Sequence, residues 1–210
     1  MHTNVLIEKL QNGELDSRLL DIYVDKKQLN YQRKRYIDAI KRFEKLYSPG
    51  FIKLFSAPGR SEVGGNHTDH QQGTVLAASI NLDNIAVVKQ TSDRTIRLVS
   101  DNYSEIEVSL DDIELRRAEK ETTKALVKGV VSGFLNRNYK VGGFCAYITS
   151  DVLIGAGLSS SAAFETVIGT IVSGLYNDMK VSAVDIAIIG HILQIESQII
   201  VTIVAICNST

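Results

Sequence analysis

The sequence predicts an α+β fold, in which a mixed sheet carries helices packed on it. Candidate strands come in runs, with helices between and after them, and do not alternate one by one with helices. Two short segments, TIRLVS (95–100) and EIEVSL (105–110), alternate apolar and polar residues like half-buried antiparallel strands. These observations favour α+β over a doubly wound parallel sheet, which would need regular alternation of strands and helices.

The first predicted elements are a helix over 30–47 and a strand that starts at Phe51. Apolar residues recur at helical spacing through LNYQRKRYIDAIKRFEKLY, with basic residues between them that we expect to form a solvated face. The segment SPG at 48–50 ends this helix. The strand FIKLFSAPGR is then expected to run into a turn at Pro58-Gly59.

The later elements follow from similar patterns. β-Branched residues predict a strand within 75–90, and a run of apolar and aromatic residues predicts another within 143–154. Helical periodicity predicts helices over 121–138, 158–176 and 182–195, and Ser182 is placed to cap the last of them. No internal repeat and no low-complexity linker interrupts the chain.

Composition limits the classes of function. The chain has 210 residues, of which 44% are hydrophobic and 22% charged, with a net charge of −1, so a nucleic-acid partner is not expected. Two cysteines provide neither a disulfide framework nor a metal cluster, which is typical of a reducing compartment. The chain has neither a secretory signal pattern nor a membrane-spanning apolar run. We therefore expect a cytoplasmic protein that does not bind membranes.

The segment 150–165, SDVLIGAGLSSSAAFE, combines glycines and serines in a way that suits anion binding. Glycines allow the backbone to approach a phosphate, and the N–H groups at the start of a helix favour negative charge. The spacing matches neither a P-loop nor a dinucleotide fingerprint. A phosphate cradle and a plain glycine-rich turn before a heavily capped helix both remain open at this point.

The segment 56–73, SAPGRSEVGGNHTDHQQG, is dense in hydrogen-bonding side chains. Six of them fall within eleven positions and suit the recognition of a hydroxyl-rich ligand: Arg60, Glu62, Asn66, His67, Asp69 and His70. The alternatives are a solvated loop and a zinc site built on the two histidines, although zinc would need a further, distant ligand.

Together the two segments resemble the galactokinase branch of the GHMP small-molecule kinases, and the resemblance runs from about residue 37 to about residue 189. It implies the fold of the N-terminal domain of that family, which is like domain 2 of ribosomal protein S5. It also implies phosphorylation of the C1 hydroxyl of galactose by ATP, with Mg²⁺ as cofactor, in a protein that is a monomer when full length.

The resemblance also implies roles for individual residues. Arg60 would stabilise the transition state, and Ser161 would bind the metal as well as a phosphate. Galactose would contact Asn66, His67, Thr68 and Asp69, and the ATP phosphates would contact Gly155, Ala156, Gly157, Leu158, Ser159, Ser160 and Ser161.

The chain departs from the family pattern at several positions. Asn66 stands where galactokinases usually have Glu, Glu62 where they usually have Asn, and Leu153 where they often have Pro. The family continues with a metal-binding Glu and a segment whose Asp contacts the reacting hydroxyl, whereas no Asp follows Asp185 here. Glu196 lies near the place of the metal ligand, but in a context that does not match.

These departures lead to a prediction for the domain organisation. We expect an N-terminal extension over 1–29, the GHMP kinase N-terminal domain over 30–195, an atypical tail over 196–210 and no C-terminal kinase domain. The apolar run IIVTIVAIC in that tail is typical of a buried strand or of a truncated or shifted reading frame. The expected function is a sugar kinase that is inactive as this chain alone; the alternative is a non-catalytic, sensor-like module that binds galactose or ATP.

Overall fold

A mixed sheet forms the middle layer of the computed structural model, which describes residues 1–64, 76–101, 103–119, 122–153 and 157–196. The strands are β1 (Lys53–Gly64), β2 (Leu76–Gln90), β3 (Thr95–Ser100), β4 (Ile106–Ser109) and β5 (Phe144–Ser150). Their order across the sheet is β1-β2-β5-β3-β4. The β3–β5 pair is parallel and the other pairs are antiparallel, so the predicted mixed sheet is confirmed.

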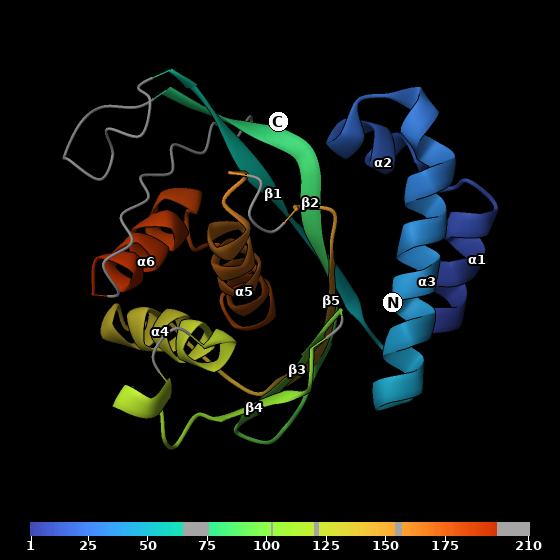
Figure 1. Ribbon diagram of the computed structural model, residues 1–210. Coiled ribbons are helices and arrows are strands. Elements are labelled where there is room, and N and C mark those ends of the chain that lie inside the picture. Colours follow the sequence, from blue (N-terminus) through green and yellow to red (C-terminus); the bar gives the residue numbers. More distant parts are fainter. Residues whose placement is uncertain (65–75, 102, 120–121, 154–156, 197–210) are drawn as a thin grey trace.

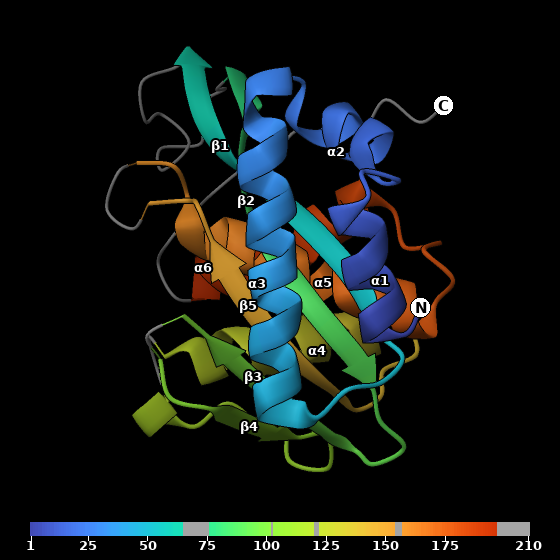
Figure 2. The ribbon, with the colours of Figure 1, turned by 90° about the vertical axis from the view of Figure 1, so that its right-hand side faces the viewer.

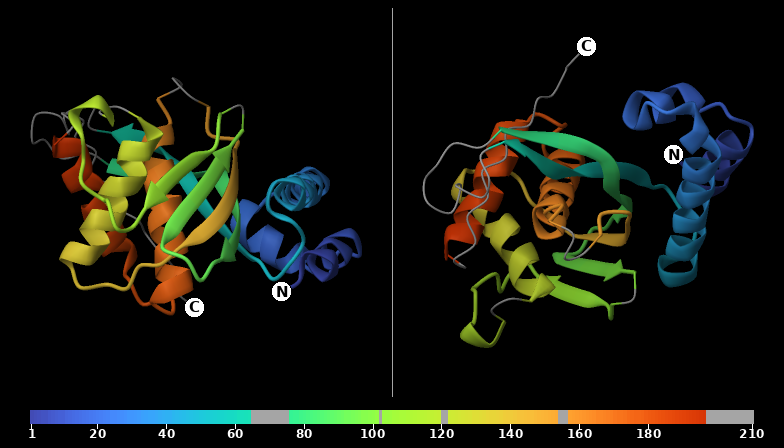
Figure 3. Two further views of the ribbon diagram at one scale, coloured as in Figure 1. Left: turned by 90° about the horizontal axis from the view of Figure 1, so that it is seen from below. Right: turned by 45° about the horizontal axis from the view of Figure 1, so that its top comes forward.

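Helices cover both faces of this sheet (Figure 1). One face carries α4 (Thr123–Asn136), α5 (Ser160–Tyr176) and α6 (Ala183–Glu196). The other carries α1 (Thr3–Gln11), α2 (Asp16–Tyr23) and α3 (Leu29–Tyr47), and the views in Figures 2 and 3 separate the two sets of helices. Among the described residues, no helix is long and apolar enough to cross a membrane.

Alternation along the central strands divides the buried side chains between two cores. On β2, Ala86 and Val88 pack with α4–α6, whereas Ile85 and Val87 pack with α1–α3. Strands buried on both faces read as continuous apolar runs in the sequence, because each side chain meets a covering helix whichever way it points.

The segment expected to be an N-terminal extension folds into α1 and α2, which pack on α3. Leu6 and Leu10 of α1 join Ile40 and Phe43 of α3 in one buried cluster. The N–H of Thr3 also donates to the Gly50 carbonyl at 3.0 Å, which fastens the start of α1 beside the end of α3.

Most of the predicted elements are confirmed, with shifts of a few residues at their ends. Ser182 caps α6 as predicted, because its hydroxyl accepts a hydrogen bond from the Asp185 N–H at 3.0 Å. Tyr47 is the last residue of α3, directly before the segment predicted to end it.

Two local predictions were wrong. No turn forms at Pro58-Gly59; β1 continues to Gly64, with shifts in its pairing to β2 between Pro58 and Arg60 and again before Gly64. Because β1 is an edge strand and bulges there, it tolerates a residue that cannot donate a ladder hydrogen bond. The basic face of α3 is also not wholly solvated: Lys34, Lys41, Arg42 and Lys45 are exposed, but Arg35 is buried.

Candidate functional site

The two polar segments singled out in the sequence meet where β1 passes the start of α5. The Arg60 N–H donates to the Leu158 carbonyl at 3.3 Å. The Nε of Arg60 donates to the Ser159 hydroxyl at 2.9 Å, across a sequence separation of 99 residues. The structure therefore places Arg60 against the loop before α5, as a site shared by the two segments requires.

Gly59 allows this close approach. A Cβ atom at Gly59 would lie 3.1 Å from the Leu158 carbonyl oxygen and 3.1 Å from Cγ1 of Val152. These distances are shorter than most Cβ contacts in proteins, so alanine or a larger residue at this position would require β1 or the loop to move.

The N-terminus of α5 is open to an anion. Ser159 is its N-cap residue, but its side chain makes no capping hydrogen bond, and the first turn contains no acidic residue. Ser160 begins the helix and Ser161 is exposed in the first turn. Backbone N–H groups at this end, together with the neighbouring Arg60 guanidinium, attract negative charge. A heavily capped helix is therefore the wrong interpretation of the serines.

The loop before α5 also leaves space for a ligand. Gly157 has φ = +72°, which favours glycine, and among the described residues no atom beyond its chain neighbours lies within 4 Å of the position its Cβ would occupy. A cleft of about 760 Å³ begins at Ser159, two residues further along, where it is lined by residues 56–60 of β1, residues 77–79 of β2, and Ala162 and Ala163 of α5. It continues between α5 and α6, where Thr166, Thr170, Ile186 and Ala187 line it. This volume falls within the range of about 300–1,000 Å³ that small-molecule sites occupy.

Some of the predicted site residues lie outside the described part of the chain. These are Asn66, His67, Thr68 and Asp69 of the proposed sugar set, and Gly155 and Ala156 of the proposed phosphate set. His70 also lies outside the described residues, so both histidines of the zinc alternative do. The described members, Arg60 and residues 157–161, come together at one place.

The sequence reasoning missed a buried polar cluster behind the site, centred on Asp83. This residue and Asn84 are both buried in β2, although they interrupt an otherwise apolar strand. A charged residue within a buried strand requires partners, since an unpaired buried charge is very costly. The polar pair Asp83-Asn84 within an apolar run was therefore a signal that could have revealed the cluster.

The described residues can contribute only part of a magnesium site. The exposed hydroxyl of Ser161 is an oxygen donor of the kind that Mg²⁺ prefers, and Mg²⁺ often takes one or two protein ligands together with phosphate oxygens and water. Among the described residues, no group of three or more His, Cys, Asp or Glu could hold a metal ion. The site thus fits an ion held mainly by the phosphates of its ligand.

Comparisons with known families match both segments. A family model described as the galactokinase galactose-binding signature matches residues 41–90. A second, described as the GHMP kinases N terminal domain, matches residues 125–204. The chain is thus similar to galactokinases over the first segment and to the N-terminal domain of GHMP kinases over the second.

The curated relatives that the chain matches include galactokinases. That of Clostridium tetani is 31% identical over 147 residues, which are 70% of this chain and 37% of the relative. That of Fusobacterium nucleatum is 34% identical over 142 residues, which are 65% of this chain and 36% of the relative. The chain thus spans little more than a third of the length of the curated relatives that it matches.

Solved structures confirm the GHMP kinase fold. The crystal structure of Lactococcus lactis galactokinase complexed with galactose superposes with a TM-score of 0.68 at 25% identity, over 75% of this chain and 41% of that one. Methanococcus jannaschii mevalonate kinase superposes with a TM-score of 0.59 at 21% identity, over 70% of this chain and 47% of that one, which supports the fold alone.

Proposed function

We propose that this chain takes part in ATP-dependent phosphorylation of galactose at its C1 hydroxyl. The observation that carries the proposal is the contact between Arg60, in the segment that matches the galactose-binding signature, and Ser159, at the start of α5. A sugar bound by the first segment and a phosphate bound by the second would lie next to each other. This adjacency is what a transfer between the two ligands requires.

Phosphoryl transfer depends more on position and charge than on covalent chemistry of the protein. In the reaction, the bond between the γ-phosphorus and its bridging oxygen breaks, a bond to the sugar oxygen forms, and the hydroxyl proton leaves. The N–H groups of residues 157–161 would hold the phosphates, and the Arg60 guanidinium would offset charge that develops on the transferred group. Mg²⁺, when bound at Ser161, supplies further neutralisation of the phosphate charge.

The sugar would be held by Asn66, His67, Thr68 and Asp69. Their oxygens and nitrogens can both accept and donate hydrogen bonds, which a set of hydroxyls needs for recognition by position. A site that hydrogen-bonds a sugar hydroxyl binds an analogue without that hydroxyl much more weakly, because a buried polar group left without a hydrogen bond costs free energy. Gly155 and Ala156 would complete the phosphate loop.

The sugar assignment is tested by ligand-induced stabilisation. Galactose that binds only the folded protein should raise its melting temperature, and Asp69→Ala should abolish this rise because the acceptor for the sugar hydroxyls is lost. Asp21→Ala is the matched control, since Asp21 is exposed on α2 and lies outside both segments. Thermal shifts are measured with galactose, with glucose and without sugar. Equal shifts in the wild type and Asp69→Ala would contradict the assignment.

A second candidate is a non-catalytic module that binds galactose or ATP. The observation that favours it is the lining of the cleft, in which the described residues include no carboxylate to orient the reacting hydroxyl. Both candidates predict ligand binding by the same residues, and only the kinase predicts consumption of ATP that depends on galactose.

A further inference from the structure

A buried ion pair joins the N-terminal helices to the sheet on the face opposite α5. Arg35 of α3 is 8% exposed and Asp83 of β2 is 2% exposed, and Nη1 of Arg35 lies 2.5 Å from Oδ1 of Asp83. Nη2 of Arg35 also donates to the main-chain carbonyl of Asp83 at 2.8 Å. The guanidinium thus binds both the side chain and the backbone of β2.

Asp83 reaches the segment that matches the galactose-binding signature. The Ser56 hydroxyl donates to Oδ2 of Asp83 at 2.5 Å, and Ser56 is the first residue of the predicted sugar segment, four positions before Arg60. The Tyr23 hydroxyl of α2 donates to the same carboxylate oxygen at 2.8 Å. One buried carboxylate therefore holds the start of the sugar segment against the N-terminal helices.

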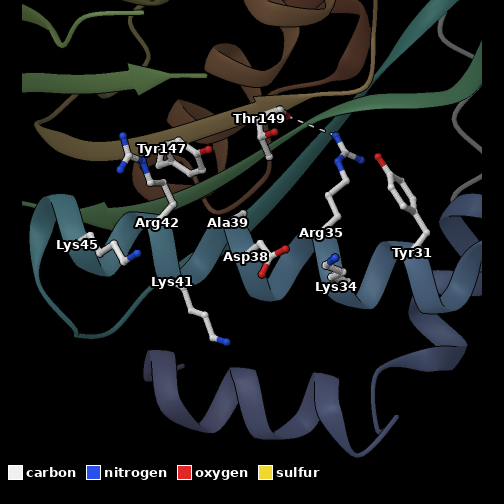
Figure 4. A pocket seen from close by; sticks show the side chains of 10 residues that line it. All are labelled: Tyr31, Lys34, Arg35, Asp38, Ala39, Lys41, Arg42, Lys45, Tyr147 and Thr149. Carbon is white, nitrogen blue, oxygen red and sulfur yellow. Dashed lines mark hydrogen bonds between the residues drawn. The ribbon is translucent and has the colours of Figure 1, made fainter. Parts of the chain in front are cut away.

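Arg35 reaches the strand end that leads into the phosphate loop. Its Nη1 lies 3.1 Å from Oδ2 of Asp151, which immediately follows β5. The Tyr31 hydroxyl donates to Oδ1 of Asp151 at 2.9 Å, and the Asp151 N–H donates to the Asp83 carbonyl at 3.0 Å. Figure 4 shows Tyr31 and Arg35 side by side on α3, with Arg35 bonded to the Thr149 carbonyl of β5.

The protonation states keep this cluster intact at neutral pH. Burial acts to lower the pKa of Arg35, but the attraction of Asp83 and Asp151 outweighs it and raises that pKa. Burial, reinforced by Asp83, raises the pKa of Tyr36 to about 12, and burial raises the pKa of Tyr23 as well. The guanidinium therefore stays charged and the phenols remain neutral donors.

Buried ion pairs contribute little net stability, because desolvation of both charges offsets their attraction. What such a pair does provide is fixed geometry, since breaking it leaves an unpaired buried charge. Here the fixed groups are Ser56, the first residue of the sugar segment, and Asp151, which lies four residues before Gly155 of the phosphate loop.

We propose that Arg35 and Asp83 are positioning residues: through Ser56 and Asp151 they hold the sugar segment and the phosphate loop at a set distance from each other. The helices on one face of the sheet thereby control the ligand site at its other face. This inference rests on the proposed function for the identity of the two ligands.

Two mild variants test separately the contact of the cluster with the sugar segment, made by Ser56, and its contact with the strand end before the phosphate loop, made by Tyr31. Both variants leave the Arg35–Asp83 ion pair in place. Ser56→Ala should weaken galactose binding about threefold to tenfold, the worth of a hydrogen bond, and leave binding of a non-hydrolysable ATP analogue unchanged. Tyr31→Phe should weaken binding of the ATP analogue by a similar factor and leave galactose binding unchanged. Arg35→Lys should weaken both, because an ammonium cannot reproduce the planar fork that serves Asp83 and Asp151 together.

The controls are chosen on the same helices. Tyr47→Phe removes a tyrosine hydroxyl of α3 that donates to Glu105 at 2.8 Å, and Asp16→Asn breaks the Asp16–Arg33 ion pair between α2 and α3. Neither side chain is hydrogen-bonded to the described part of the two ligand segments, so both controls should keep wild-type affinity for both ligands. A purely structural role of the cluster would lower stability in the variants but leave the affinity of the folded protein unchanged.

Amide hydrogen exchange gives a readout that does not depend on ligands. Ser56→Ala should speed exchange in residues 57–61, and Tyr31→Phe in the residues that follow Asp151, relative to the controls. If the wild type binds neither ligand, the proposed function is contradicted. The rates of amide exchange in these residues still test whether Arg35 and Asp83 position the two segments. Unchanged affinities with unchanged local exchange, or the same changes in Tyr47→Phe, would overturn the inference.

Discussion

Ser159 illustrates at the scale of one residue how the site departs from ordinary local structure. A serine before a helix usually caps it, yet Ser159 has φ = 55° and ψ = 51°, and its hydroxyl accepts from Arg60. The left-handed conformation costs a non-glycine residue about 1–2 kcal/mol. Strain of this kind persists only where surrounding contacts impose it, and it clusters at ligand sites.

Gly157 provides the residue-scale prediction. Gly157→Ala should weaken binding of an ATP analogue, because it adds a methyl group to the open space before α5 and disfavours φ = +72°. Gly13→Ala is the matched control, since Gly13 has φ = +74° but lies between α1 and α2. Calorimetric titration should show weaker binding only for Gly157→Ala. Equal affinity in both variants would mean that the loop is merely a turn.

At the scale of elements, the site depends on how closely α5 lies against β1. A Cβ at Gly174 of α5 would come within 2.4 Å of the Phe55 ring of β1. Glycine is a poor helix former, so its presence near the end of α5 indicates that close packing outweighs helix propensity there. The same contact sets the position of β1, which carries Arg60.

Gly174→Ala should therefore destabilise the fold. The gain in helix propensity is at most about 1 kcal/mol, whereas overpacking against a rigid ring costs about 1–3 kcal/mol, so we expect a net loss of up to about 2 kcal/mol. Urea unfolding measures this loss. In a Phe55→Leu background the added methyl group should cost less, because the ring it meets is gone. Equal or greater stability of Gly174→Ala in the wild-type background would contradict this packing.

At the scale of the whole molecule, the described part of the chain is a sheet between two helical layers (Figure 1). The described residues bring together the start of α5, which is the candidate anion site, the Arg60 guanidinium and a cleft of about 760 Å³. Phosphoryl transfer also needs a group that orients the attacking hydroxyl, and such a group typically contributes about 10²–10⁴-fold to the rate.

We therefore predict that the 210-residue chain alone does not consume ATP in the presence of galactose. Arg60 and Ser161 would neutralise charge but would not orient the hydroxyl, and the described residues that line the cleft include no carboxylate that could. A coupled assay with galactose and MgATP should give the rate of a buffer control, even where one ligand binds. Turnover that persists through purification and disappears in Arg60→Ala would contradict this prediction, and Glu62 and Glu196 would then be the first carboxylates to replace.

The local pattern of the sequence was sufficient for most of the fold. Periodicity located the helices and strands, because side-chain direction repeats every 3.6 residues in a helix and every two in a strand. The glycines and serines before α5 indicated an anion site for a similar reason, since backbone freedom and unpaired N–H groups are properties of a short segment. The sugar assignment to residues 66–69 stays a prediction.

The tertiary structure decided what depends on distant partners. β1 continues through Pro58 and Gly59 because pairing with β2 and a bulge accommodate them, and local turn chemistry alone favours the opposite. Arg35 is buried because Asp83 and Asp151 compensate its charge, 48 and 116 positions further along the chain. The sequence by itself determined which segments form helices, strands and a candidate anion loop, whereas only folding brought Arg60 to Ser159, because the free energy of such contacts arises from burial and pairing between segments that are remote in the chain.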